Sequence, residues 1–374
     1  MINKEIKIFL TADLHIGMLF NRYPEFIKED LRNARIKTLD RMVRTANHLE
    51  CNIFVIAGDL FDKVNGISQK MINEVLDALN YFTGQCILVL PGNHDYDNGM
   101  IDLWTKFTNN MLDNLILLNE EKPYLLDEYG IDATVYPAPC HAKHSKENNL
   151  AWIREEKFDE SRIIIGIGHG AITDISPDLK NEYYSMTLQE LNDIPVDLWL
   201  LGHTHLPYPQ QENTNDIKVF NPGTHEPDGL DCKHKGNAWI INVDIDKNVS
   251  ANRLITGTYK FIDKVFEVKD QDDLDNMYNE VLMDNPDMTI ARITLVGRID
   301  EETRDYCNSV IEKLNKELAY LMTDSIDLGI KVSTEKIHKE FSEKSFPQEF
   351  LLSFADDEDT LQLAYELIME VREW

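Results

Sequence analysis

Short apolar runs that recur through the first two thirds of the sequence constrain the fold most. They lie at residues 6–10, 53–57, 86–90, 163–167 and 198–201. The runs are rich in β-branched residues and mostly continuous, as in strands that are buried on both faces. Apolar residues at helical spacing stand between them, at 39–46 and 71–79. Because strands alternate with helices, the sequence predicts an α/β layered domain.

Each apolar run is followed directly by side chains that can bind metals. The clusters are Thr11-Ala12-Asp13-Leu14-His15, Gly58-Asp59-Leu60-Phe61-Asp62, Gly92-Asn93-His94-Asp95, Gly168-His169-Gly170 and Gly202-His203-Thr204-His205. Catalytic groups of α/β proteins gather at strand ends, because the sheet holds the loops rigidly and leaves their side chains accessible. A single Gly-His or Gly-Asp pair would be uninformative. The joint occurrence of all these clusters at strand ends indicates a functional site.

The residue types in the clusters suit the hydrolysis of phosphodiesters. Two divalent cations about 3.5–4 Å apart lower the pKa of a bound water and neutralise charge on the attacking and leaving oxygens. One carboxylate must bridge the ions to keep them this close. Imidazole, carboxylate and amide ligands without thiolate favour manganese, iron, zinc or magnesium-like ions over copper(I) or an iron–sulfur cluster.

The composition limits what the chain can do alone. With 66 acidic and 37 basic residues, its formal net charge is -29. Such a surface repels phosphate backbones, so tight DNA binding would need metal ions, a basic patch or a partner protein. The 5 cysteines never form a C-x-x-C pair and are expected to be reduced thiols. Because the sequence shows neither a signal-peptide layout nor an apolar run of membrane-spanning length, we expect a cytoplasmic protein with no membrane contact.

The clusters, taken together, are similar to the five motifs of the calcineurin-like metallophosphoesterase superfamily. By this resemblance, one metal would be held by Asp13, His15, Asp59 and His205. The second would be held by Asp59, Asn93, His169 and His203. Asp59 is thus the expected bridge. The catalytic positions implied by the resemblance are His94, which would help to protonate the leaving 3′ oxygen, and Asp95, which would orient His94 or its loop.

Two stretches of sequence resemble a narrower group, the SbcD-type DNA-repair nucleases. These stretches are Ala12-Asp13-Leu14-His15-Ile16-Gly17 and Ala57-Gly58-Asp59-Leu60-Phe61-Asp62, and Asn221-Pro222-Gly223-Thr224 agrees with them. The resemblance implies a manganese-dependent DNA exonuclease, with endonuclease activity as a further expectation. It also implies a coiled-coil ATPase partner of the SbcC type in a repair complex. A homodimer formed through the helix at 71–79 is expected from the same family.

The length of 374 residues predicts a large domain followed by smaller parts. We expect a layered α/β metallophosphoesterase fold at 1–258, with two central β-sheets flanked by helices. Strands at 217–220, 238–244 and 253–259 would complete its second sheet. A small α+β module at 259–345 falls where the family carries its DNA-capping domain. The remaining residues, 346–374, are expected to be a helical segment that docks the partner.

Within the small module, strands at 264–268, 289–296 and 328–333 alternate with expected helices at 272–283 and 301–321. This part of the sequence has no histidine cluster. The last segment places apolar residues at 350–354 and 361–371 on either side of an acidic stretch, 356–359.

Several readings stay open from the sequence. A phosphodiesterase for small diesters such as cyclic nucleotides shares the same motifs, although more than about 100 residues without ligands at the C-terminus favour a long substrate. A metal-bound scaffold without turnover usually loses ligands, and none is missing here. The loop from Cys140 to His144 carries three potential ligands, but ligands this close together rarely complete a tetrahedral site alone. The pair His225-Glu226 is expected to be a solvated turn rather than a further site. Cleavage polarity, the native metal and a role in repair or in defence are not determined by the motifs.

Overall fold

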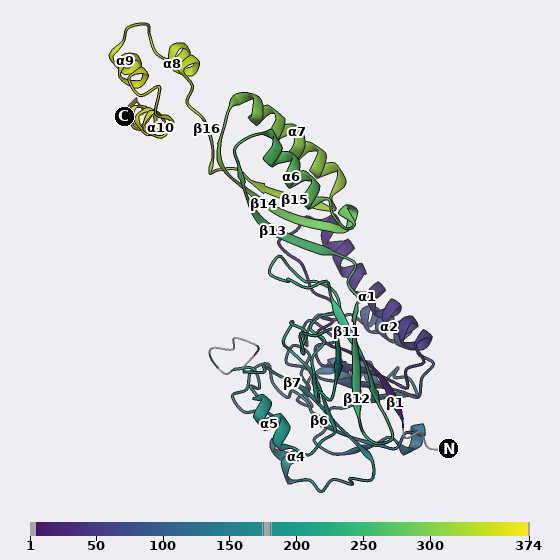
Figure 1. The fold of residues 1–374 in the computed structure, drawn as a ribbon. Coiled ribbons are helices and arrows are strands. Elements are labelled where there is room, and N and C mark those ends of the chain that lie inside the picture. Colours follow the sequence, from purple (N-terminus) through teal and green to yellow (C-terminus); the bar gives the residue numbers. More distant parts are fainter. Residues whose placement is uncertain (1–4, 174, 176–179, 181, 373–374) are drawn as a thin grey trace. The chain divides into compact units, whose positions relative to one another are not determined.

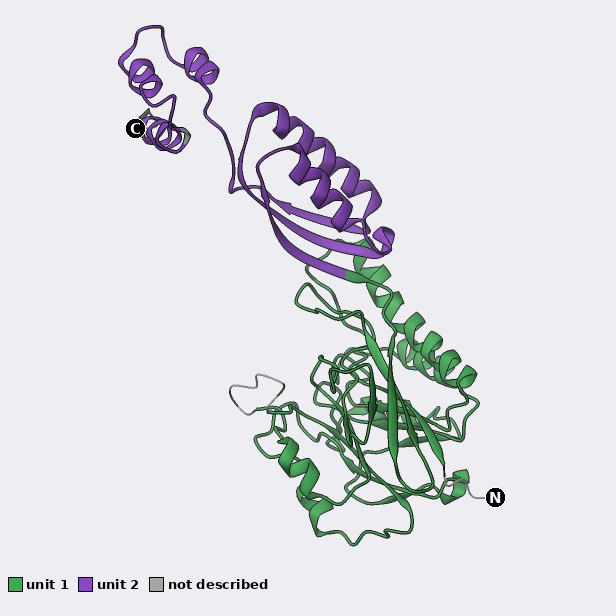
Figure 2. Ribbon diagram, viewed as in Figure 1, with its two compact units in different colours: residues 1–260 green, residues 261–374 purple. Residues whose placement is uncertain are grey.

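The computed structural model describes residues 5–173, 175, 180 and 182–372. The chain divides into two compact units, residues 1–260 and 261–374, which Figure 2 shows in different colours. The expected first domain, 1–258, stops two residues short of this division. The division does not separate the expected last segment, 346–374, from the α+β module before it.

The first sheet of unit 1 has the strand order β4-β3-β2-β1-β11-β12-β9. Its strands are β1 (Ile6–Thr11), β2 (Ile53–Ala57), β3 (Cys86–Leu90), β4 (Leu115–Leu117), β9 (Asn213–Asn215), β11 (Asn237–Val243) and β12 (Val249–Ile255). Strands β1 to β4 are parallel to one another, and β11 pairs antiparallel with β1. The carboxyl ends of β1, β2 and β3 therefore meet at one edge of the sheet.

The second sheet of unit 1 has the order β10-β8-β7-β6-β5. Its strands are β5 (Tyr124–Leu125), β6 (Ala133–Ala138), β7 (Ile163–His169), β8 (Leu198–Gly202) and β10 (Val219–Phe220). The strands from β6 to β10 in this sheet are parallel, and β5 is antiparallel to β6. The carboxyl ends of β7 and β8 thus lie together.

Helices cover the outer face of each sheet (Figure 1). The first sheet is covered by α1 (Glu25–His48), α2 (Gln69–Leu79) and α3 (Asp102–Thr108), and the second by α4 (Ala151–Glu155) and α5 (Leu188–Asp193). A short 3-10 helix, η1 (Asp127–Tyr129), precedes β6. The expected α/β layered fold with two central sheets is confirmed.

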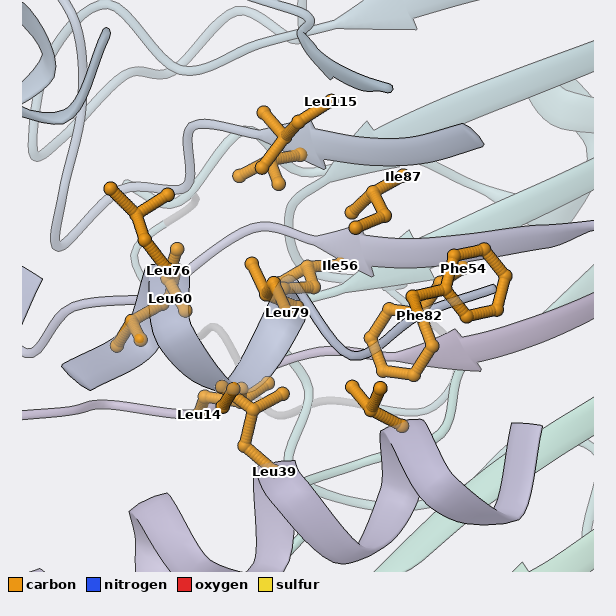
Figure 3. Close-up of a cluster of buried hydrophobic side chains, with 14 of the residues drawn as sticks. Leu14, Leu39, Phe54, Ile56, Leu60, Leu76, Leu79, Phe82, Ile87 and Leu115 are labelled. Atoms are coloured by element: carbon orange, nitrogen blue, oxygen red, sulfur yellow. The ribbon is translucent and has the colours of Figure 1, made fainter. Parts of the chain in front are cut away.

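Strand β2 shows why the apolar runs are continuous. Phe54 and Ile56 pack against the helices, in the cluster that Figure 3 shows in close-up. Ile53 and Val55 point the other way, into the apolar layer between the two sheets. Because successive side chains of a strand point to opposite faces, a strand with both faces buried needs apolar residues at every position.

One expectation about the second sheet is wrong. Of the three late strands, β10 does lie in it, but β11 and β12 belong to the first sheet. Trp239 and Ile241 of β11 face the layer between the sheets, while Ala238 and Ile240 face the helices. An apolar run indicates that a strand is buried, but it does not indicate which strand pairs with it.

Unit 2 begins with a separate α+β layer. Its sheet contains β13 (Lys260–Val268), β14 (Thr289–Ile299), β15 (Tyr320–Asp324) and β16 (Leu328–Ile330). Helices α6 (Gln271–Val281) and α7 (Glu301–Glu317) pack on one face of this sheet (Figure 1), and η2 (Pro286–Met288) precedes β14. The expected helix at 301–321 is too long, because the backbone becomes extended at Leu318 and residues 320–324 pair with β14.

The C-terminal part of unit 2 consists of α8 (Thr334–Glu340), α9 (Phe346–Leu352) and α10 (Glu358–Arg372). Ile337 and Phe341, in and just after α8, share a buried cluster with Leu351 of α9 and Leu361 of α10. The helical segment therefore starts before residue 346, since α8 packs with the two later helices. The expected boundary at 345/346 cuts through this cluster.

Candidate metal centre

The loops that follow five strands bring the predicted ligands together. Asp13 and His15 follow β1, Asp59 follows β2, and Asn93 and His94 follow β3. From the second sheet, His169 ends β7, while His203 and His205 follow β8. Parallel strands present their carboxyl ends at the same edge, so the two sheets place these loops opposite one another. All these side chains except those of His94, His203 and His205 are buried.

A first group of donor atoms surrounds the end of the His15 side chain. Its Nε2 lies 3.1 Å from Nε2 of His205 and 3.5 Å from Oδ2 of Asp59. Oδ1 of Asp13 is 3.6 Å from the same His205 nitrogen. Donor atoms about 2.1 Å from one ion and at right angles to each other are about 3 Å apart. This group therefore has the spacing of a metal site.

A second group surrounds Oδ1 of Asn93. This oxygen lies 3.0 Å from Nε2 of His169 and 2.9 Å from Nδ1 of His203. The Asn93 amide nitrogen donates to the carbonyl of Lys143 at 3.5 Å, which turns the oxygen towards the two imidazoles. Nδ1 of His169 donates to the carbonyl of Ala57 at 2.9 Å, so its Nε2 carries the lone pair in the neutral ring.

Asp59 belongs to both groups. Its Oδ2 is 3.5 Å from Nε2 of His15 and 3.3 Å from Nε2 of His169. Its other oxygen, Oδ1, accepts from the backbone N–H of His94 at 2.8 Å. One buried carboxylate oxygen thus lies between the two sets of donors. This is the position that a carboxylate bridge between two cations requires, so the residues present fit a two-metal centre.

The electrostatics of the site show that its acidic side chains require positive charge. Burial alone would raise the pKa of Asp59, but His169 and His15 more than offset this and hold the pKa well below its usual range. Burial would lower the pKa of His169, but Asp59 raises it to about 9. Burial lowers the pKa of His203 to about 3. Cations bound at these atoms would satisfy the same carboxylates in place of protons.

The backbone is held in the left-handed region at four predicted ligands. The φ angles are 54° at Asp13, 42° at His15, 52° at Asp59 and 90° at His203. This conformation costs a residue other than glycine roughly 1–3 kcal/mol and persists only where the surroundings impose it. The loops after β1 and β2 impose it on each other, since His15 N–H donates to the Asp59 carbonyl at 2.9 Å.

His94 lies at the rim of the two groups. Its Nδ1 donates to the backbone carbonyl of Asp62 at 2.9 Å, and its ring is 4.8 Å from that of His15. The side chain is half-buried. With Nδ1 engaged, Nε2 is the nitrogen that can exchange a proton with a substrate. His15, Asp62 and His94 also lie within ligand distance of one another, so geometry alone allows His94 to bind a metal.

Asp95 contacts the loop that carries His94, which is one of the two orienting roles that the resemblance implies. Its carboxylate is fully buried and accepts from the backbone N–H of Phe61 at 3.0 Å and of Gly92 at 2.7 Å. Burial raises its pKa to about 7. The side chain therefore ties the loop after β3 to the loop after β2. The imidazole of His94 itself is oriented by the Asp62 carbonyl.

Two residues near the centre were missed by the sequence analysis. Oδ2 of Asp228 accepts from Nδ1 of the predicted ligand His205 at 2.7 Å. The guanidinium of Arg35 is buried and donates to the carbonyls of Leu14 at 2.6 Å and Asp13 at 3.2 Å. Asp228 lies four residues after the Asn-Pro-Gly-Thr turn, which was a usable signal. Arg35 lies in the middle of α1, where nothing in the sequence distinguishes it.

The loop at Cys140 and the pair His225-Glu226 have structural roles. Cys140 is buried and its thiol donates to the His169 carbonyl at 3.4 Å, while His141 is exposed and bonds the Asp97 carbonyl. The expected solvated turn at His225-Glu226 is wrong, because both side chains are buried. Nε2 of His225 donates to the carbonyl of Arg35 at 3.0 Å.

Replacing the shared carboxylate tests the two-metal geometry. We expect Asp59→Asn to lose both ions, because an amide has no charge to hold two cations together. Elemental analysis and Mn²⁺ titration of the purified variant measure this. Asp97→Asn is the control, since Asp97 bonds Gly99 and Asn119 and lies outside both groups of donor atoms. Two ions bound to Asp59→Asn at wild-type affinity would contradict the bridging role.

Comparison with known proteins agrees with this geometry. Residues 6–207 match the family model described as Calcineurin-like phosphoesterase. The chain is 26% identical over 202 residues to the metallophosphoesterase YhaO of Bacillus subtilis, a match that covers 52% of this chain and 47% of that protein. Metallophosphoesterases of two Helicobacter pylori strains are 28% and 29% identical over 33% and 32% of this chain, and 28% and 27% of their own.

All three relatives are named as uncharacterised proteins, and the match spans about half of the length of the first and less of the other two. The family model covers more than half of this chain and includes each strand whose end carries a predicted ligand. The chain belongs to the calcineurin-like phosphoesterase family, whose members are metal-dependent phosphoesterases.

Proposed function

We propose that the chain is a DNA nuclease that hydrolyses phosphodiesters with two divalent cations, manganese being the expected metal. The observation that carries the proposal is the shared position of Asp59 Oδ2. This oxygen lies 3.5 Å from Nε2 of His15 in one group of ligands and 3.3 Å from Nε2 of His169 in the other. Cations held there would generate a nucleophile from water and neutralise charge on the attacking and leaving oxygens. Such a centre can cleave a bond between phosphorus and oxygen at neutral pH.

The chain's own residues supply the remaining steps. Asp13, His15 and His205 would hold one cation beside Asp59, and Asn93, His169 and His203 would hold the other. His94 stands at the rim with Nδ1 bonded to the Asp62 carbonyl, so its Nε2 can deliver a proton to the leaving 3′ oxygen. Asp95 fixes the loop that carries His94 through the amides of Phe61 and Gly92.

One feature suits any substrate that carries a nucleobase, and a second favours a nucleic acid over a cyclic nucleotide. The ring of Tyr183 lies 5.2 Å from that of His203 and 5.1 Å from that of His144, so an aromatic surface adjoins the second group of ligands. Aromatic rings stack on nucleobases, which DNA and cyclic nucleotides both carry. In addition, the groups of potential metal ligands found among the described residues all lie in unit 1, while residues 261–374 form a second compact unit. A separate unit without ligands suits a long substrate better than a small diester.

An ATPase partner of the SbcC coiled-coil type, in a complex for DNA repair or recombination, is part of the same proposal. An apolar groove of about 610 Å³ lies between α9 and α10. It is lined by Phe346, Pro347, Phe350, Phe354, Thr360, Leu363, Ala364, Leu367, Ile368 and Val371. Phe346 is 77% exposed and Leu367 is 55% exposed, values typical of a surface that a partner covers.

Charge also favours a basic partner at this groove. Acidic residues 356, 357 and 359 stand in the connection between α9 and α10 and at the start of α10, and the whole chain carries -29. A basic protein bound there would bring the positive charge that DNA binding needs. A homodimer through α2 is a further part of the proposal. Cytoplasmic location is proposed because DNA is the substrate. Among the described residues, no helix has the length and apolar character to span a bilayer.

The substrate is tested by assaying one manganese-loaded preparation on linear single-stranded DNA, linear duplex DNA and cyclic nucleotides in parallel. We expect manganese-dependent cleavage of DNA that leaves a 3′ hydroxyl, because His94 is proposed to protonate the leaving 3′ oxygen. Chelation of the metal should abolish it. Turnover of cyclic nucleotides without cleavage of either DNA would sink the nuclease proposal and support the small-diester reading.

Replacing His94 separates proton transfer from metal binding. We expect His94→Ala to keep both cations and to lose activity by roughly a hundredfold or more, the usual scale for a general acid. His141→Ala is the matched control, because Nδ1 of His141 also bonds a backbone carbonyl, that of Asp97, at 2.8 Å. Loss of a cation from His94→Ala would instead make His94 a ligand.

Docking of the partner is tested by placing a charged side chain in the groove. We expect Leu367→Asp to abolish co-elution with a purified SbcC-like ATPase and to abolish ATP-stimulated cleavage of duplex DNA. Manganese-dependent cleavage of short single strands should persist, since the predicted ligands lie in unit 1. Ile326→Asp is the control, because Ile326 is 88% exposed in unit 2 and does not line the groove. Unchanged co-elution of Leu367→Asp would refute docking at this groove.

A further inference from the structure

His205 differs from the predicted ligands His15 and His169 in how its ring is held. Its side chain is 36% exposed, whereas that of His15 is 3% exposed and that of His169 is fully buried. Packing therefore fixes the rings of His15 and His169 more tightly than that of His205. A mobile imidazole is a weak ligand, because each ion bound must first restrict the ring. Something other than burial has to orient it.

The carboxylate of Asp228 provides that orientation. Its Oδ2 accepts from Nδ1 of His205 at 2.7 Å, within the range of charge-assisted hydrogen bonds. A proton held at Nδ1 leaves the lone pair on Nε2, which is the nitrogen 3.1 Å from His15 Nε2 and 3.6 Å from Asp13 Oδ1. Where His169 uses a backbone carbonyl for this purpose, His205 uses a full negative charge, which makes the ring a stronger electron donor.

The segment that carries Asp228 is itself fixed to the loop that carries Asp13. The hydroxyl of Thr224 donates to the Asp13 carbonyl at 3.0 Å, and Arg35 donates to both that hydroxyl and that carbonyl at 3.1 and 3.2 Å. The side chain of Asp228 is 17% exposed. The carboxylate thus reaches His205 from a segment that cannot shift without moving a second predicted ligand of the same group.

We propose that Asp228 is the positioning residue of the metal site formed by Asp13, His15 and His205, holding the His205 ring in the tautomer and orientation that binds the cation. The inference rests on the ligand set proposed above but not on DNA as the substrate. The proposal affects only one of the two metal sites. The site on the His205 side depends on Asp228, while the site formed by Asn93, His169 and His203 does not.

The test is a titration of the full-length protein with Mn²⁺, in which the electron paramagnetic resonance signal reports free ion. For Asp228→Ala we expect one of the two sites to weaken by roughly 10–100-fold, the usual effect of removing a group that orients a ligand. Asp228→Asn should also weaken that site, because its amide can donate to Nδ1 and move the ring proton to Nε2, where it blocks the ion. The second site should keep its affinity.

Asp197→Asn is the matched control. Asp197 is 18% exposed, accepts from the Ile164 amide and pairs with Lys247. The variant therefore removes a carboxylate of similar exposure that lies outside both groups of ligands. It should bind two ions as the wild type does. Asp228→Asn fills the volume of the native side chain, so it decides the question if Asp228→Ala does not fold.

The positioning role would be overturned if the Asp228 variants bound Mn²⁺ at both sites with wild-type affinity, or if both sites weakened equally. Wild-type protein that binds no Mn²⁺ would overturn the ligand set and this inference together. Protein that binds two ions but does not cleave DNA would overturn the nuclease proposal alone, because the titration does not depend on turnover.

Discussion

The candidate centre depends above all on the packing of two sheets against each other. The apolar layer between them joins Val55 and Leu88 of the first sheet to Ile165 and Leu200 of the second. This contact brings the carboxyl ends of two separate sets of strands within hydrogen-bonding distance. The approach is so close that a Cβ on Gly202 would lie 2.0 Å from the carbonyl oxygen of Ala57. Only glycine fits there, and the same applies to Gly58 and Gly92, where a Cβ would lie 2.0 Å from the His169 ring and 2.2 Å from the Asp59 carboxylate.

Electrostatic repulsion opposes this arrangement, and it shapes the site in a definite way. Asp13 and Asp59 are buried in a chain whose net charge is -29. Burial raises the pKa of Asp13, so ionisation of both carboxylates is favoured when cations lie between them. The left-handed backbone at four ligands adds strain that packing and hydrogen bonds must offset. A centre that brings together carboxylates of like charge and strained loops is stabilised by the ion it binds, because bound metal favours the folded state.

The layered fold and the seven candidate ligands could be read from the sequence because their signals are local. An apolar run followed at once by Asp or His marks a strand and its loop together, and the structure gathers these residues into two groups that share Asp59. Non-local features could not be read in this way. The partner of β11, the contact of Arg35 with Asp13 and the pairing of Asp228 with His205 each join residues far apart in the chain.

Buried polar contacts also connect the centre to the last residues of unit 1, just before β13. The carboxylate of Glu226, two residues before Asp228, is buried and accepts from the backbone N–H groups of Thr258 and Tyr259 at 2.7 to 2.9 Å. Arg35 donates to the Glu226 carbonyl at 3.4 Å and to that of Asp13 at 3.2 Å. An unpaired buried carboxylate is costly, so the backbone at 258–259 cannot leave Glu226 without a large penalty. The position of the chain where it exits unit 1 is therefore tied, through one short segment, to the residues that orient the metal ligands.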